Sequence, residues 1–504
     1  MRSFLISILL LTGFVHAQQT AQVERFWLKP NTHTTVKSFQ FYRLDSLITN
    51  DSSKIQFRIL PDVQFAINSF SNNTSEFKLQ TGLNFSIEGN YRQKISYMFD
   101  LRSGISNQSI LPYNSIFQNK SMFYKDLNLE NPYQDYIFYG DLRGRILYKP
   151  TKIVTLSTGI DKLYIGEGDR SLFLGNQGVA APFAALVATF NKFEYQFIQQ
   201  IWREKEGNHY VPKGNATHFL SFKPTKKWNV GLFENVVYQI KDTLYNRGLE
   251  VEYLNPLIFY RPQEYNMGSS DNVLLGLNIS FTHKNTMVYG QLLLDDFLLS
   301  AILKRNKWWA NKFGAQLGVK GWKQIDSTTN LFYRTELNLV RPYTYSQKFS
   351  GGVMGNQGLP VAHPLGSNFL ELYQEISFHR KKWSFEIWGQ AYLKGDDWFT
   401  TAKTTSYGGD IYQSYNKYAK EFGNTIGQGK TKQILQFGTY ISRKINYERI
   451  FFELIKLPKM LQSNQMSIFI EPKVRFSNVE GENFTNYFIT FGTIKTLGRE
   501  RRNY

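Results

Sequence analysis

Apolar and polar residues alternate in short runs along most of the chain from Lys54 onward. A period of two is the signature of a β-strand with one apolar and one polar face. In the run 333–339, for example, Tyr333 and Leu337 lie on one face, and Arg334 lies on the other. The clearest runs are 55–59, 95–102, 140–148, 333–339, 383–394 and 470–476. The pattern therefore predicts an all-β protein built from antiparallel strands.

A soluble sandwich also alternates, so two further features are needed to favour a membrane barrel. The predicted strands are about 9 to 11 residues long, as a tilted membrane crossing requires. Their polar faces repeatedly carry charges of both signs, as the wall of a wet lumen would. About 18 such segments are present, which suits the even strand numbers of bacterial barrels. We therefore expect residues 51–504 to form a transmembrane antiparallel β-barrel.

The stretch from Arg247 to Ser300 combines long apolar runs with charges that no buried core would accept unpaired. We expect it to form two or three strands and a loop that closes over the barrel mouth. Its best pair of acids is Asp295 and Asp296. A hydrolase would need a third group that the sequence does not identify, so we favour a salt bridge to an arginine in the lumen.

Short and long connections alternate between the predicted strands. Basic tight turns at 149–152, 223–226 and 379–382 predict one end of the barrel. Longer connections at 107–134, 204–216, 342–367 and 394–431 predict the other, outward end. The last strand is expected at Phe484 to Leu497, where aromatic residues alternate.

The N-terminus indicates export. Arg2, the apolar run Phe4 to Val15 and the small-residue site ending at Ala17 predict a signal peptide over residues 1–17. Residues 18–50 are expected to be a short periplasmic lead-in. The predicted location is the cell outer membrane.

Composition narrows the range of partners. The chain has 504 residues, no cysteine, 16% aromatic residues and a formal net charge of +19. Such a charge suits nucleic acid, an anionic membrane surface or an acidic polymer, and it also serves solubility. For an exported protein nucleic acid is the poorest of these partners, which leaves outer-membrane lipid and acidic polymer.

Motifs for enzymatic chemistry are absent from the sequence. There is no H-E-x-x-H, no His cluster at metal spacing and no G-x-S-x-G. The segment Gly166 to Arg170 lacks the ending of a phosphate loop and is interpreted as a strand-to-loop turn. His363 fits a hydrogen-bonded loop histidine better than a ligand or base. Trp308 and Trp309 could stack on sugars, but the flanking apolar strands favour a membrane-interface belt. We expect no enzymatic activity, no cofactor and no metal.

Several blocks in a fixed order resemble the Wzi capsule-assembly family, and most closely its RemB-like gliding-motility branch. These blocks are R-S-L-F-L (170–174), A-P-F (181–183), E-Y-L-N-P-L-I-F-Y-R-P (252–262), G-S-S-D-N-V-L-L-G-L (268–277), Y-G-Q-L-L-L-D-D-F (289–297), W-W-A-N-K-F-G (308–314), R-P-Y-T-Y-S (341–346) and A-H-P-L-G-S-N-F (362–369). The resemblance implies an 18-stranded outer-membrane barrel, a lumen plugged by surface loops, and a role in holding capsular polysaccharide. The gliding-related branch implies a role in movement or adhesion.

The favoured hypothesis is a non-enzymatic barrel that binds or retains a surface polysaccharide, with an acidic polymer suited to the net charge. The residues expected to contact the polymer or fold the plug are Arg170, Arg261, Glu264, Asp295, Arg341, Tyr343, Tyr345 and His363. A porin-like solute channel, a membrane hydrolase or acyltransferase, and an adhesin of a gliding machinery are the alternatives. Motility or secretion machinery is a further candidate partner, and a monomer is favoured.

Overall fold

The computed structural model describes residues 54–69, 75–92, 94–106, 123–127, 136–175, 179–206, 209–240, 248, 250–256, 271–296, 300, 303–399, 404–445 and 466–495. The predicted signal peptide (1–17) and lead-in (18–50) lie outside the described residues. So do two of the predicted site residues, Arg261 and Glu264.

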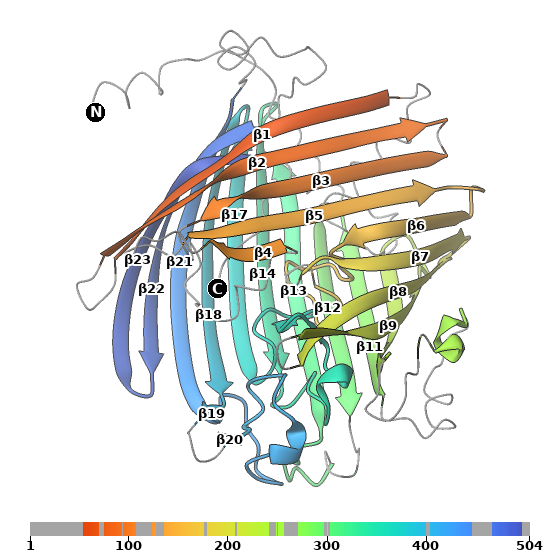
Figure 1. Ribbon diagram of the computed structural model, residues 1–504, viewed down its shortest axis with the longest axis vertical. Helices are drawn as coiled ribbons and strands as arrows, with labels where there is room; N and C mark the ends of the chain where they lie inside the picture. Colours follow the sequence, from red (N-terminus) through yellow and green to blue (C-terminus); the bar gives the residue numbers. More distant parts are fainter. Residues whose placement is uncertain are drawn as a thin grey trace.

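The described strands form one antiparallel sheet that closes on itself. The wall consists of β1 (Lys54–Ser69), β2 (Ser75–Tyr91), β3 (Ile95–Ser106), β5 (Tyr136–Tyr148), β6 (Val154–Asp161), β7 (Ala181–Phe190), β8 (Phe193–Glu206), β9 (His209–Phe222), β10 (Trp228–Gln239), β11 (Asn272–His283), β12 (Thr286–Asp296), β13 (Lys312–Gln324), β14 (Thr329–Val340), β17 (Phe369–Arg380), β18 (Trp383–Asp396), β21 (Lys430–Ile445), β22 (Met466–Val479) and β23 (Glu482–Lys495). A short strand, β4 (Phe123–Leu127), pairs with the first residues of β5 and brings the sheet to 19 strands. Pairing of β1 with β23 closes the wall (Figure 1). The prediction of a barrel of about 18 strands is confirmed.

Strand β17 shows how the sequence produces a two-sided wall. Buried and exposed residues alternate along its whole length. Its lumen face consists of Phe369, Glu371, Tyr373, Glu375, Ser377 and His379. Its outer face carries Leu370, Leu372, Ile376 and Phe378, which are 38–47% exposed. Acids that point inward and aliphatic residues that point outward reverse the arrangement of a soluble protein, so the outer surface requires an apolar solvent.

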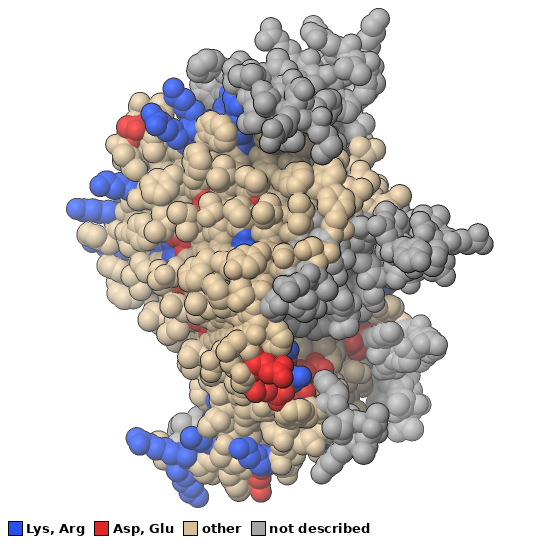
Figure 2. All heavy atoms as spheres, turned by 90° about the vertical axis from the view of Figure 1, so that its left-hand side faces the viewer, with Lys and Arg blue, Asp and Glu red and all other residues tan. Residues whose placement is uncertain are grey.

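The other strands of the barrel also carry apolar side chains on the outside and polar side chains on the inside. Large apolar side chains are exposed on outward positions of most strands, including Ile146 on β5, Val288 on β12 and Leu317 on β13. Figure 2 shows a broad band in which uncharged residues predominate, with most Lys and Arg near the two ends. Among the described residues, no helix is long and apolar enough to cross a membrane. The 18 wall strands range from 8 to 17 residues, so many extend beyond the predicted membrane crossing.

The predicted basic turns lie at one end of the wall, and the long connections after β14 and β18 lie at the other, as predicted. The basic turns at 149–152, 223–226 and 381–382 join adjacent strands. The long connections after β14 and β18 lie together at the lower end of Figure 1. The prediction of a long connection at 204–216 was wrong, because β8 and β9 run through it as a hairpin. Its polar residues Lys213 and Asn215 line the lumen, which made a strand resemble a loop.

Two connections fold inward and fill the lumen. We call residues 162–175, which follow β6, the first plug segment. Residues 341–368, which follow β14, are the second plug segment and include the short pair β15 (Gly355–Asn356) and β16 (Leu359–Pro360). The two segments are joined directly, because the N–H of Gly175 donates to the carbonyl of Val361 at 2.7 Å. The predicted plugging of the lumen by loops is confirmed.

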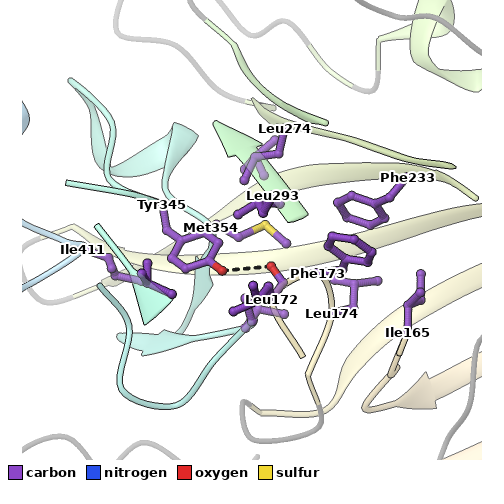
Figure 3. Packing of buried hydrophobic residues seen from close by; sticks show 14 of the residues in the cluster. Ile165, Leu172, Phe173, Leu174, Phe233, Leu274, Leu293, Tyr345, Met354 and Ile411 are labelled. Carbon is purple, nitrogen blue, oxygen red and sulfur yellow. Dashed lines mark hydrogen bonds between the residues drawn. The ribbon is translucent and has the colours of Figure 1, made fainter. Parts of the chain in front are cut away.

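The plug is held partly by an apolar cluster inside the barrel. Phe173 of the first plug segment stacks on Phe233 of β10, with ring centroids 4.3 Å apart. Leu172 and Tyr345 come from different plug segments and are joined by a hydrogen bond from the tyrosine hydroxyl to the leucine carbonyl (Figure 3). The lumen at this level is therefore a packed core rather than an open channel.

Candidate functional site

Arg170 lies at the centre of the first plug segment and is fully buried. Its guanidinium pairs with Asp169, lies 3.8 Å from a carboxylate oxygen of Glu371 on β17, and packs on the ring of Tyr373. Asp169 in turn pairs with Arg334 on β14 at 2.9 Å. The plug segment is thus attached to the wall by buried charges. A contact between Arg170 and polymer stays a prediction.

Asp295 also lies inside the barrel, near the end of β12. One carboxylate oxygen lies 3.1 Å from Nζ of Lys312 on β13, and the other accepts the backbone N–H of Tyr345 at 2.7 Å. Asp296 reaches the same ammonium group at 2.8 Å from a more exposed position. The expected salt bridge is present, but its cation is Lys312 rather than an arginine. Asp295 and Tyr345 therefore position the second plug segment, and polymer contact by either stays a prediction.

His363 is a hydrogen-bonded loop histidine, as the sequence favoured. Its Nε2 lies 2.8 Å from a carboxylate oxygen of Glu371, and its Nδ1 accepts the N–H of Leu365 at 3.2 Å. Both contacts are satisfied by the neutral ring with its proton on Nε2. Burial lowers the pKa of His363 below its usual value, which keeps the ring neutral. His363 is fully buried, and its binding of a ligand remains a prediction.

Tyr343 connects the second plug segment to the connection between β18 and β21. Its hydroxyl donates to the carbonyl of Ser406 at 2.8 Å, and its N–H donates to that of Gly408 at 3.1 Å. Tyr343 and Tyr345 have positive φ angles of 66° and 72°. This backbone conformation is costly for bulky residues and persists only where the surroundings enforce it. The two tyrosines therefore mark a strongly constrained turn at the barrel mouth.

An aromatic cluster lies above that turn, and we call it the mouth cluster: Trp308, Trp309, Tyr343, Tyr415 and Tyr418. The ring of Trp309 is at its centre, 5.0 Å from Tyr415, 5.0 Å from Tyr418 and 5.8 Å from Tyr343. The backbone of residues 306–309 is hydrogen-bonded to that of residues 421–424, which fixes two distant loops against each other. The interpretation of Trp309 as part of a membrane-interface belt was wrong, because loop tyrosines cover the ring instead of lipid.

Arg341 lies beside this cluster, directly after β14. Its Nη2 donates to the carbonyl of Trp308 at 3.2 Å, and the guanidinium packs on Phe313 with Cζ 5.5 Å from the ring centroid. Nε has no hydrogen-bond partner. Among the described residues, no carboxylate lies within ion-pairing distance of Arg341, and burial alone lowers its pKa. Arg341 is half-buried, and neutral groups position its guanidinium.

Exposed cations surround the mouth cluster: Lys304, Arg305, Lys307, Lys417 and Lys420. Tyr418 and Phe422 add apolar surface at 39% and 48% exposure. Glu421 is the acid within this group. The face thus combines cations with aromatic surface.

Sequence reasoning missed Tyr415 and Tyr418. The pattern Y-Q-S-Y-N-K-Y-A-K at 412–420 alternates aromatic and basic residues inside a long predicted connection, and that was the available signal. Among the described residues, no group of three or more His, Asp or Glu side chains could hold a metal ion.

Comparison with known proteins supports the fold. No family model matches the sequence. No curated protein matches it either. Among solved structures, the chain resembles Wzi of Escherichia coli, described as an outer membrane protein involved in group 1 capsule assembly and a carbohydrate-binding β-barrel. The TM-score is 0.53 at 12% identity, over 95% of this chain and 99% of that one.

Two further matches are more distant. OprD of Pseudomonas aeruginosa has a TM-score of 0.40 and 8% identity over 89% of this chain and 98% of that one. OccAB1 of Acinetobacter baumannii has a TM-score of 0.43 and 10% identity over 88% and 96%. The closed wall, the apolar outer face and the likeness to Wzi together identify the fold of an outer-membrane β-barrel.

Proposed function

We propose that this protein is a non-enzymatic outer-membrane barrel that binds an acidic polysaccharide at its loop end and retains it at the cell surface. Arg341 carries the proposal, because it is a half-buried guanidinium beside the mouth cluster with no carboxylate partner among the described residues. In outer-membrane barrels the longer loops face the outside of the cell. The site would therefore meet a polymer at the surface.

The chemistry of this face suits acidic sugars. A guanidinium offers two parallel N–H donors that match a carboxylate. Tyr418 offers the face of a ring to the apolar side of a sugar, and the exposed lysines nearby raise the local concentration of a polyanion. The polymer would bind through several weak contacts, and salt should weaken them.

A solute channel is the second candidate, since a wall of about 18 strands is wide enough to enclose an aqueous pore. The packed core around Phe173 and Tyr345 opposes it. Planar-bilayer recording separates the two functions: a polysaccharide-retaining barrel with a filled lumen should show little conductance, whereas steady ion flux would favour the channel.

Binding can be tested with purified protein and two probe polymers, polygalacturonate as the acidic polymer and dextran as the neutral one. We expect the protein to bind polygalacturonate in preference to dextran. Arg341→Ala should weaken this binding by about tenfold, close to one lost charge-assisted contact. Arg380→Ala is the matched control, because it removes an exposed arginine from the opposite end of the barrel. Equal binding by both variants and the unaltered protein would refute the role of Arg341.

A role in gliding or adhesion would use the same face. Deletion of the gene, with capsule retention and surface movement scored separately, distinguishes the two. Loss of retained polymer with normal movement supports the proposal. Loss of movement alone, with polymer retained, would replace it with the motility function.

A further inference from the structure

The described short turns lie together at the end of the wall opposite the long connections. Backbone hydrogen bonds join each of these described turns to a neighbouring strand or turn. The bonds run from Lys149 to Lys94, Thr189 to Ile153, Lys223 to Lys192, Thr282 to Lys227, Trp322 to Asn285, Lys381 to Thr328 and Lys444 to Lys382, at 2.7–3.3 Å. The backbone that carries the side chains of these turns is therefore tied to the wall.

Charges on these turns are almost all positive. The exposed cations, which we call the basic rim, are Arg92, Lys94, Lys152, Lys192, Lys226, Lys227, Lys284, Lys323, Arg380 and Lys381. Asp326 is the one exposed carboxylate in the described turns, and it is already bound by the N–H and hydroxyl of Thr328. The loop end differs, since Glu421, Glu480 and Glu482 are exposed there among the lysines. Exposed charges of almost one sign are thus found at the turn end and not at the loop end.

Aromatic rings lie on the outer wall directly beside these cations. The exposed set is Tyr91, Tyr148, Phe190, Trp228 and Trp383, at 38–49% exposure. Arg92 packs over Tyr91 and Arg443 over Trp383, each with Cζ 5.1 Å from the ring centroid. Outward aromatic rings of this kind occur at the level of lipid headgroups in membrane barrels. The basic rim therefore starts where the hydrocarbon layer ends.

We propose that the basic rim binds the phosphate groups of anionic phospholipids in the periplasmic leaflet. Short turns face the periplasm in outer-membrane barrels, which places the rim against that leaflet. A merely solvated rim would not need one sign of charge or neighbouring rings at headgroup depth. The occupant is a lipid because exposed aromatic rings of the lipid-facing wall adjoin the rim cations directly. The rim would fix the height of the barrel in the membrane.

The test measures lipid preference at the protein surface. The full chain is reconstituted in phosphatidylcholine vesicles with trace spin-labelled phosphatidylglycerol or phosphatidylcholine, and electron spin resonance reports which lipid is immobilised. The unaltered protein should immobilise phosphatidylglycerol in preference. A variant with Lys192→Gln, Lys226→Gln, Lys227→Gln and Lys284→Gln should lose roughly fivefold or more of this preference, since one basic residue near an anionic surface is worth about that factor.

The control variant carries Lys304→Gln, Arg305→Gln, Lys307→Gln and Lys420→Gln at the loop end. This control variant should retain the preference for phosphatidylglycerol, and the rim variant should retain binding of polygalacturonate. The two assays therefore distinguish a failure of this proposal from a failure of the proposed function. Heat-modifiable gel migration confirms that each variant contains a folded barrel, and Lys227→Gln alone serves if the fourfold variant does not fold. Unaltered protein without a preference for phosphatidylglycerol, or a folded rim variant with an undiminished one, would overturn the proposal.

Discussion

The ring of Trp309 lies nearly parallel to that of Tyr418, with centroids 5.0 Å apart and an angle of 13° between the planes. One residue precedes β13 and the other precedes β21, so the stack joins two connections that the wall alone does not bring together. The rigid arrangement of the proposed polymer-binding face depends on it.

Replacement of Trp309 by alanine should therefore weaken polygalacturonate binding by about tenfold, or ~1.4 kcal/mol, because the loops that carry the cations separate. Trp228→Ala is the matched control, since it removes an exposed indole from the opposite end. Binding curves for both variants and heat-modifiable gel migration give the answer. A Trp309 variant with full binding would show that the stack does not organise the face.

The buried ion pair between Lys312 and Asp295 leads to a prediction about stability. In Lys312→Met, Asp295 loses its cation inside the lumen, and the loss of one partner of a buried pair costs about 3–5 kcal/mol. Urea unfolding of the vesicle-bound protein should show the decrease. Addition of Asp295→Asn to Lys312→Met should restore part of the stability, because the uncompensated charge is then absent. Equal stability of the single variant and the unaltered protein would contradict this.

His363 should make attachment of the second plug segment depend on pH. Burial lowers its pKa in the folded protein below 6.5, so the unfolded protein binds the extra proton more readily. The stabilising contribution is full above pH 6.5 and decreases as the pH falls towards the lowered pKa. Glu371 favours the charged ring, whereas Arg170 and Lys394 oppose it, and burial is the largest effect.

The measurement is hydrogen exchange of residues 341–368 between pH 5 and 8. Exchange, corrected for its intrinsic pH dependence, should rise as the pH falls. His363→Gln should remove most of this dependence, since glutamine does not titrate in the range. A variant that keeps the full pH dependence would assign the effect to another group.

Gly408 has a φ of 76°, and a methyl group on it would overlap the backbone nitrogen of Tyr343. Gly408→Ala should therefore loosen the mouth loop, with faster proteolysis at 404–429 and weaker polymer binding. Gly423→Ala is a close control, because Gly423 has a φ of 75° and its added methyl group would meet nothing within 4 Å. Its effect should be limited to about 1–2 kcal/mol of backbone strain. Equal effects of the two substitutions would exclude the steric contact.

Local alternation was sufficient to predict the wall. In β14, Leu337 faces outward and Glu336 inward, as the period of two indicated. The plug was harder to locate, because Leu172 and Phe173 look like residues of an ordinary strand. What holds Leu172 inside is a hydrogen bond from its N–H to Gln291, a residue far away in the sequence.

The candidate site was predicted only in part, because its contacts also form between residues that are far apart in the sequence. Arg341 was expected, and the structure places it at the mouth, but its environment is produced by loops that meet only after the barrel closes. Trp309 was assigned to the membrane interface because of its flanking strands, whereas Tyr415 and Tyr418 decide its position. Period-two patterns describe which way a strand residue points, and they contain no information about contacts between loops.

Closure between β1 and β23 has a consequence for biogenesis. The N–H of Val63 donates to the hydroxyl of Thr493 at 3.1 Å, across a separation of 430 residues. Until the last strand has emerged and entered the membrane, the first strand keeps an unsatisfied hydrogen-bonding edge that invites aggregation. The edge of β1 is therefore protected only once β23 has paired with it, which makes closure of the seam the step that ends this exposure.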